Sequence, residues 1–245
     1  MTADPLAPLL DLVDVEPALA RARDSVDAAL RHRALRRLGG QVAAEVGLRS
    51  AVASASLDGY AAQRDRVRAG LVTDPVVQGA LRVAGALHPL AELWPIAPRQ
   101  ALAKLHVLAL RGVVPDDELG RPAPGGATAR FAALAELATG ASRVPPLLVA
   151  AVVHGELLTL RAFAGPSGVL ARAAARLVLI SSGFDPRGLV APEIGHLTRQ
   201  PEYVGAAGAY ATGTRDGIRA WVRHCAVATE LGAAELVTIG DELVT

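Results

Sequence analysis

The chain has 245 residues, a formal net charge of +1 and only 3% aromatic residues. Because the charges nearly balance, neither nucleic acid nor an anionic membrane surface is an expected partner. One cysteine, Cys225, excludes an intrachain disulfide framework and a cysteine metal cluster. With 51% hydrophobic residues and few aromatics, the core must consist of leucine, valine and alanine, which favours an all-α fold.

Two segments, the N-terminus and the longest apolar run, predict a cytoplasmic protein. The first residues, MTADPLAPLLDLVDVEP, are acidic and interrupted by proline, unlike a secretory signal. The longest apolar run, residues 144–153, contains two prolines and is far shorter than the ~20 residues of a membrane span.

Apolar residues at helical spacing, separated by glycine and proline, predict successive helices. Leu19, Val26 and Leu30 form a stripe on the first helix, and Gly39 and Gly40 end it. This break divides the chain into an N-terminal helical segment, residues 1–40, and a main helical domain, residues 41–245. The helices predicted in the first half cover residues 16–38, 41–57, 60–69, 74–88 and 99–112.

The second half begins with an irregular segment, residues 114–126, that is rich in proline and glycine. A tight loop at residues 161–166 then separates two apolar helices and forms the centre of a predicted helix–loop–helix. The helices predicted in this half cover residues 127–139, 145–160, 167–182, 201–212 and 216–232.

The loop and the start of the following helix, residues 160–172, read LRAFAGPSGVLAR. This stretch resembles the active-site motif of the Fic (Fido) family of protein AMP-transferases, H-P-F-x-(D/E)-G-N-G-R-x-x-R. Phe163, Gly168 and Arg172 match the motif and are assigned to holding the loop. The resemblance implies a Fic-like helical bundle with this helix–loop–helix at its centre and an N-terminal inhibitory-type helix.

Three further segments keep the order of the Fic family along the chain. Residues 105–108, LHVL, resemble its L-H-x-x-L helix, and residues 201–228 resemble its closing helices. Residues 54–59, SASLDG, resemble the inhibitory motif (S/T)-x-x-x-E-(G/N). Ser54, Asp58 and Gly59 then stand at the motif positions, with aspartate in place of glutamate. The order and spacing of these pieces, rather than any single one, carry the resemblance.

The reactive positions depart from the family pattern. Arg161 stands where the family has its general-base histidine, and a guanidinium with a pKa above ~12 accepts no proton near neutral pH. Gly165 replaces the acidic magnesium ligand, and Ser167 replaces the asparagine. Pro166 lacks an N–H for the phosphate cradle, and Val169 replaces the first motif arginine. We therefore predict no catalytic residue and no metal site.

Some capacity to bind an anion is predicted to remain at the loop. Ser167 is a candidate cap for a helix N-terminus, which carries partial positive charge. Arg161 and Arg172 flank this end, and Arg176 lies one turn further along the same helix face. The alternative is that these arginines pair with carboxylates or stay solvated.

The resemblance also implies a contact between Asp58 and Arg172. In the family, the inhibitory glutamate pairs with the last motif arginine and blocks the nucleotide's terminal phosphate. Aspartate is one methylene shorter, so a close backbone approach must supply the missing reach. The alternative is an ordinary helix that ends at Asp58 and Gly59.

Other histidines are not expected to replace the missing base. His154 lies two helical turns before Arg161, a displacement of ~10 Å, and is expected to be structural. His106 is expected to be a core residue with a hydrogen-bond partner. Residues 113–126 show little alternating pattern, which predicts a reduced form of the family's β-hairpin flap.

Two functional hypotheses follow from these residues. The first is a non-catalytic regulatory or interaction module that binds a protein partner. A homodimer is compatible with this hypothesis. The second is an active nucleotidyl- or phosphate-group transferase with a non-standard site. For the second hypothesis the resemblance implies ATP with magnesium as the cofactor.

Overall fold

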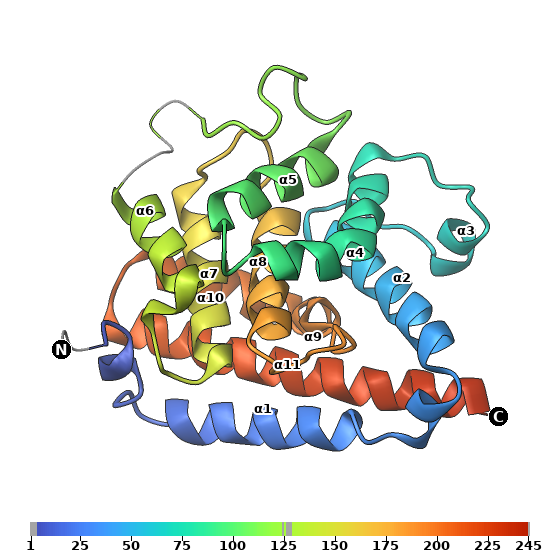
Figure 1. Cartoon of the computed structure of the whole chain (residues 1–245), viewed down its shortest axis with the longest axis horizontal. Coiled ribbons are helices and arrows are strands. Elements are labelled where there is room, and N and C mark those ends of the chain that lie inside the picture. The colour runs from blue at the N-terminus through green and yellow to red at the C-terminus, as the bar shows by residue number, and fades with distance from the viewer. Residues whose placement is uncertain (1–3, 124, 126–128, 245) are drawn as a thin grey trace.

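The computed structural model describes residues 4–123, 125 and 129–244 (Figure 1). These residues form the predicted all-α structure, and β pairing among them is limited to isolated bridges of Arg111 with Val114 and of Pro122 with Phe163. The α-helices are α1 (Val15–Ala29), α2 (Gly39–Leu57), α3 (Arg64–Arg68), α4 (Pro75–Leu93), α5 (Pro98–Leu110), α6 (Ala129–Glu136), α7 (Pro146–Leu160), α8 (Gly168–Ser181), α9 (Pro192–Thr198), α10 (Gln200–Ala211) and α11 (Arg215–Val244).

Helices α7 and α8 form the centre of the bundle. Ten of the 15 residues of α7 and twelve of the 14 residues of α8 are buried. Helix α7 is apolar on nearly every face, which is typical of a helix enclosed by protein. The two helices pack on each other, and α8 also contacts α2, α4 and α5. No helix within the described residues is long and apolar enough to cross a membrane.

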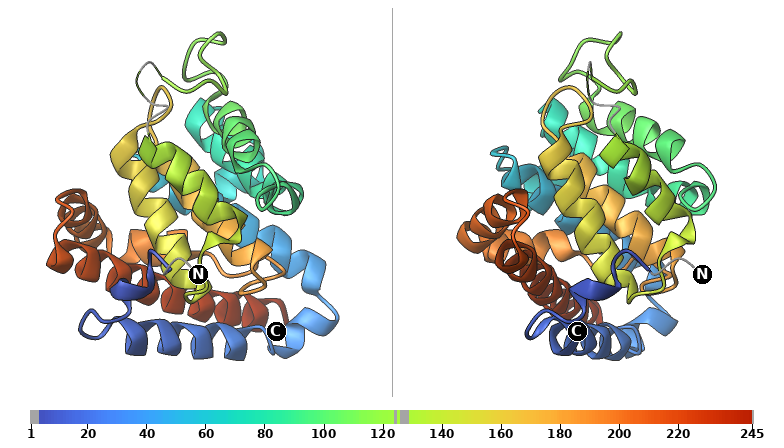
Figure 2. Two further views of the ribbon diagram at one scale, coloured as in Figure 1. Left: turned by 60° about the vertical axis from the view of Figure 1, so that its left-hand side comes forward. Right: turned by 90° about the vertical axis from the view of Figure 1, so that its left-hand side faces the viewer.

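The 30-residue helix α11 runs along one edge of the molecule with α1 beside it (Figures 1 and 2). It also packs on α7, α9 and α10, and the buried Trp221 donates its Nε1–H to the carbonyl of Ala151 in α7 at 2.8 Å. Val26 of α1 and Ile239 of α11 belong to one hydrophobic cluster. The boundary predicted at residue 40 therefore falls in the first turn of α2, between segments that share a core.

The first predicted helix, residues 16–38, is wrong at its C-terminal end. Helix α1 ends at Ala29, and a short 3-10 helix, Arg33–Arg36, follows. The helix stops because His32 has φ −56° and ψ 135°, and its Nδ1 accepts the N–H of Ala34. The helix predicted at 60–69 is reduced to α3, since Gln63 before it is extended.

Two other boundaries depend on packing that no local pattern reveals. Helix α4 continues through the exposed Pro89 to Leu93, because Leu87 and Leu90 on its inner face stay buried. The last predicted helix, residues 216–232, continues to Val244, and Leu236 extends its buried face.

The remaining differences concern α9 and α6. Helix α9 is not predicted, because seven residues carry little periodicity and its stability comes from packing on α2 and α11. The start predicted at residue 127 lies outside the described residues, and the part of α6 that is described begins at Ala129.

Gly79 offers a test of the packing between α4 and α5. A Cβ at this position would lie 1.9 Å from the carbonyl oxygen of Ala109, whereas a Cβ at Gly85 of the same helix meets nothing within 4 Å. Gly79→Ala is therefore expected to lower the free energy of unfolding by about 1–3 kcal/mol. Gly85→Ala is expected to raise it by up to about 1 kcal/mol, through helix propensity. Urea unfolding of both variants measures the difference, and equal effects would contradict the close crossing.

Candidate functional site

A cavity of about 540 Å³ lies where the loop between α7 and α8 meets the end of α2 and one face of α10. It contains several of the residues singled out from the sequence, namely Asp58, Arg161, Ser167, Gly168 and Arg172. The other described residues that line it are Leu158, Thr159, Pro166, Tyr203, Val204, Ala207 and Ala211.

Asp58 joins the end of α2 to the start of α8. Its Oδ2 accepts the backbone N–H of Val169 at 3.1 Å, and its Oδ1 accepts from Nη2 of Arg172 at 2.9 Å. A Cβ at Gly168 would lie 2.0 Å from Oδ1, so only glycine permits this approach. The short aspartate thus reaches the helix N-terminus because the backbone at Gly168 comes close. Gly59 follows with φ 91° and lies outside the cavity lining.

Ser167 precedes α8 but does not cap it. It occupies the N-cap position with φ −90° and ψ −8°, and its hydroxyl makes no capping hydrogen bond. The expected cap is therefore wrong, because the carboxylate of Asp58 already takes the N–H of Val169. Ser167 is one of the residues that line the cavity.

Arg172 is the buried cation of this site, with 3% of its surface exposed. Its Nε donates to Oγ of Ser54 at 2.9 Å, Nη2 donates to the carbonyl of Ser54 at 2.8 Å, and Nη1 donates to the hydroxyl of Tyr203 at 3.2 Å. Burial opposes the charged form, but Tyr203 and Asp58 outweigh it, so the pKa of Arg172 lies above its ordinary value. The sequence singled out Ser54 but missed Tyr203.

Arg161 and Arg176 lie in opposite environments. Arg161 ends α7 in the left-handed conformation, with φ 44°, and its exposed side chain lines the cavity. The predicted anion site required Arg176 to line the cavity, but Arg176 is not among the lining residues. It is buried, donates to Oγ of Ser50 at 3.0 Å, and lies 3.8 Å from a carboxylate oxygen of Glu193. It faces α2 and α9 because the contact with α2 continues one turn beyond Arg172.

Phe163 and His106 stabilise the motif loop through contacts that do not involve Arg172. The two rings stack with centroids 4.9 Å apart. Nδ1 of His106 accepts the N–H of Gly120 at 2.9 Å, so Nε2 carries the proton and donates to the carbonyl of Ala164, also at 2.9 Å. The N–H of Ala123 donates to the loop as well, at the carbonyl of residue 162. His106 is thus a buried residue with hydrogen-bond partners, as expected, and it ties the segment after α5 to the loop.

Three buried histidines, His154, His196 and His224, pack against the ring of Tyr203. The Tyr203 hydroxyl accepts from Arg172, so its own proton points to Nε2 of His154, 3.1 Å away. Nδ1 of His196 lies 3.0 Å from Nε2 of His224. Burial, with help from the charge of Arg172, lowers the pKa of His154 well below its ordinary value of 6.5, and burial lowers the pKa of His196 likewise. Both rings are therefore neutral, and neither lines the cavity.

The described lining residues include hydrogen-bond donors suited to an anion but no free base. Arg161, Ser167, Arg172 and the first residue of α8, Gly168, all line the cavity. The only carboxylate among the described lining residues is Asp58, and both of its oxygens are engaged. Gly165 offers no side-chain oxygen where the resemblance places the magnesium ligand, and no group of three or more metal-ligating side chains occurs among the described residues. The donor set therefore does not fit a hard cation.

Replacing Arg172 tests its structural role. Arg172→Ala leaves the Asp58 carboxylate without its cation, and the free energy of unfolding is expected to fall by about 3 kcal/mol or more. Arg161→Ala, at an exposed side chain with no hydrogen bond or ion pair to the described residues, is expected to change it by less than about 0.5 kcal/mol. Urea unfolding compares the two, and similar losses would refute the assignment of Arg172 as the central contact.

The neutral histidines make stability depend on pH. Their native pKa values are depressed, so the unfolded chain binds more protons below pH 6.5 and stability falls as the pH decreases. Each histidine contributes a loss of up to about 1.4 kcal/mol per pH unit in this range. Urea unfolding at pH 7.5 and pH 5.5 is expected to show a loss of roughly 2 kcal/mol, and His154→Gln is expected to lose less. An unchanged slope in the variant would contradict this role.

Comparisons with known proteins agree with this architecture. No family model matches the sequence, and no curated protein is detectably similar to it. Among solved structures, a Fic family protein from Desulfovibrio desulfuricans G20 superposes with a TM-score of 0.70 at 21% identity, over 91% of this chain and 74% of that chain. A fragment of Fic-1 from C. elegans superposes with a TM-score of 0.72 at 17% identity, over 97% of this chain and 76% of that chain. The chain therefore has the Fic fold.

Proposed function

We propose that this protein is a regulatory or interaction module built on the Fic fold, which does not transfer AMP. Its motif loop binds an anionic group of a protein partner, and Asp58 occupies that position in the free chain. The observation that supports the proposal is that residues suited to an anion line the cavity together with an arginine where the resemblance places the base. The cavity keeps Arg172 and the N-terminus of α8, yet Arg161 stands at the position of the base.

The absence of a usable base follows from the contacts of the candidates. Asp58 is the only carboxylate of the described lining, and its oxygens accept from Arg172 and from a backbone N–H. His154 is the histidine behind the cavity, and its Nε2 is taken by Tyr203. Neither group faces a position where it could remove a proton from a hydroxyl in the cavity.

Two lining residues whose side chains have no partner among the described residues, the cation Arg161 and the hydroxyl-bearing Ser167, support an anionic partner. Arg161 makes no hydrogen bond or ion pair with the described residues, and it is an exposed residue that lines the cavity. Ser167 lines the same cavity, and its hydroxyl makes no capping hydrogen bond. A carboxylate or phosphate on a partner protein would be bound by these groups and by the helix N-terminus once Asp58 had moved away.

A second candidate function, nucleotidyl or phosphate transfer by a non-standard site, is favoured by the size of the cavity. A volume of about 540 Å³ is within the range of small-molecule sites. The phosphates of ATP fit the N-terminus of α8 and Arg172, but the donor set does not fit magnesium. This candidate therefore depends on nucleotide binding that does not require the metal.

Calorimetric titration with ATP, ADP and inorganic phosphate, with and without magnesium, tests the anion site. Asp58→Ala removes the internal competitor and is expected to bind these anions at least about tenfold more tightly than the natural chain. Asp65→Ala, at an exposed carboxylate of α3, is the matched control and is expected to bind as the natural chain does. Equal affinity in all three proteins would refute the anion site.

Labelled-nucleotide transfer separates the two candidate functions. The natural chain and Asp58→Ala are both expected to transfer no label from ATP to themselves or to lysate proteins. Transfer by either protein that is abolished in Arg172→Ala would overturn the non-catalytic proposal in favour of the transferase.

A further inference from the structure

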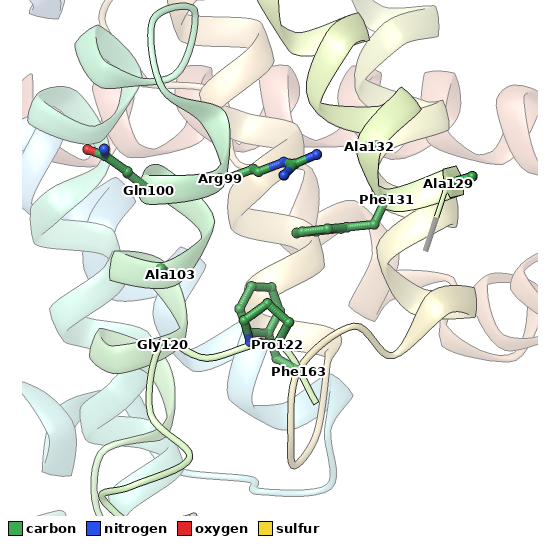
Figure 3. Close-up of a pocket in the computed structure, with 9 residues that line it drawn as sticks. All are labelled: Arg99, Gln100, Ala103, Gly120, Pro122, Ala129, Phe131, Ala132 and Phe163. Atoms are coloured by element: carbon green, nitrogen blue, oxygen red, sulfur yellow. The ribbon is translucent and has the colours of Figure 1, made fainter. Parts of the chain in front are cut away.

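A second concave site lies between α5 and α6 and shares no lining residue with the candidate functional site (Figure 3). Its main part has a volume of about 470 Å³, and an adjoining part of about 330 Å³ shares Arg99, Gln100 and Ala132 with it. The two parts therefore form one groove, which runs from Phe163 in the motif loop to the end of α6 at Glu136.

The walls of the main part are apolar. Figure 3 shows the ring of Phe131 on α6 facing the rings of Phe163 and Pro122. The ring centroids of the two phenylalanines lie 5.9 Å apart at an interplanar angle of 81°. Small side chains on the facing helices, Ala103 and Ala132, leave the space between them open. A groove of this kind offers an apolar ligand contact on several sides.

One cation, Arg99, lies where the two parts of the groove meet. Arg99 reaches from α5 toward the aromatic wall in Figure 3. It makes no hydrogen bond or ion pair with the residues that the structure describes, including Glu136, which lines the adjoining part. The first turn of α5 also has no acidic residue and no side-chain cap, so the helix dipole adds positive potential at the same end.

We propose that this groove binds a small apolar carboxylic acid. The carboxylate is held by the guanidinium of Arg99 in a charge-assisted, two-pronged hydrogen bond, and the apolar body packs against the wall to which Phe131 and Phe163 contribute. An apolar site with one oriented cation selects a molecule that is hydrophobic except for one anionic end. The proposal does not depend on the function of the motif loop, because the two sites have different lining residues.

The test uses phenylacetate and its neutral counterpart phenylacetamide as probes in calorimetric titrations of the full chain. Phenylacetate is expected to bind, and Arg99→Gln is expected to weaken it about tenfold while leaving phenylacetamide unchanged. Lys104→Gln is the matched control, since it removes an exposed charge from the same helix outside the groove. It is expected to leave both affinities unchanged.

Filling the groove gives an independent readout. Ala132→Leu places a larger side chain in both parts of the groove and is expected to abolish binding of both probes, with folding verified by thermal unfolding. The proposal is overturned if phenylacetate does not bind at millimolar concentration or if Arg99→Gln and Lys104→Gln have equal effects. A folded Ala132→Leu variant with unchanged affinity would overturn it as well.

Discussion

The candidate site depends on one buried charge, the guanidinium of Arg172. It lies in the first turns of α8, where the helix N-terminus already carries partial positive charge. Such a position is stable only if anionic or hydrogen-bond-accepting groups surround it, and Asp58, Ser54 and Tyr203 supply them. Because these partners come from α2 and α10, a single side chain fixes the relative positions of three helices.

The same contact closes the site. Asp58 satisfies both Arg172 and the free N–H of Val169, so an external anion must compete with a carboxylate that is already in place. This explains which motif residues persist. Gly168 allows the approach of the carboxylate and Arg172 receives it, and both serve the folded structure whether or not any group is transferred. Arg161 and Gly165, which differ from the family pattern, take no part in this contact, and Val169 takes part only through its backbone N–H.

The motif loop has a polar face and an apolar face with separate supports. On the polar face, the start of α8 is held by Asp58. On the apolar face, His106 bonds to Ala164 and Gly120, and its ring supports that of Phe163. The loop therefore keeps its shape through contacts that involve no side chain of the substituted reactive positions, since Val169 takes part only through its backbone N–H. The groove beside Phe163 is a product of this apolar support, since α6 packs on α7 rather than closing against α5.

The sequence by itself determined the helical architecture and the helix–loop–helix, because helix periodicity is local. The contact of Asp58 with Arg172 was implied only by the resemblance to the Fic family, with an ordinary helix end as the alternative, and the tertiary structure decided between them. Only the tertiary structure decided the orientation of Tyr203 toward Arg172, the burial of Arg176 against Glu193, and the stop of α1 before His32. It also decided the existence of α9 and the length of α11. These features arise where segments distant in sequence pack together, and a side chain's direction there is set by the neighbour that buries it.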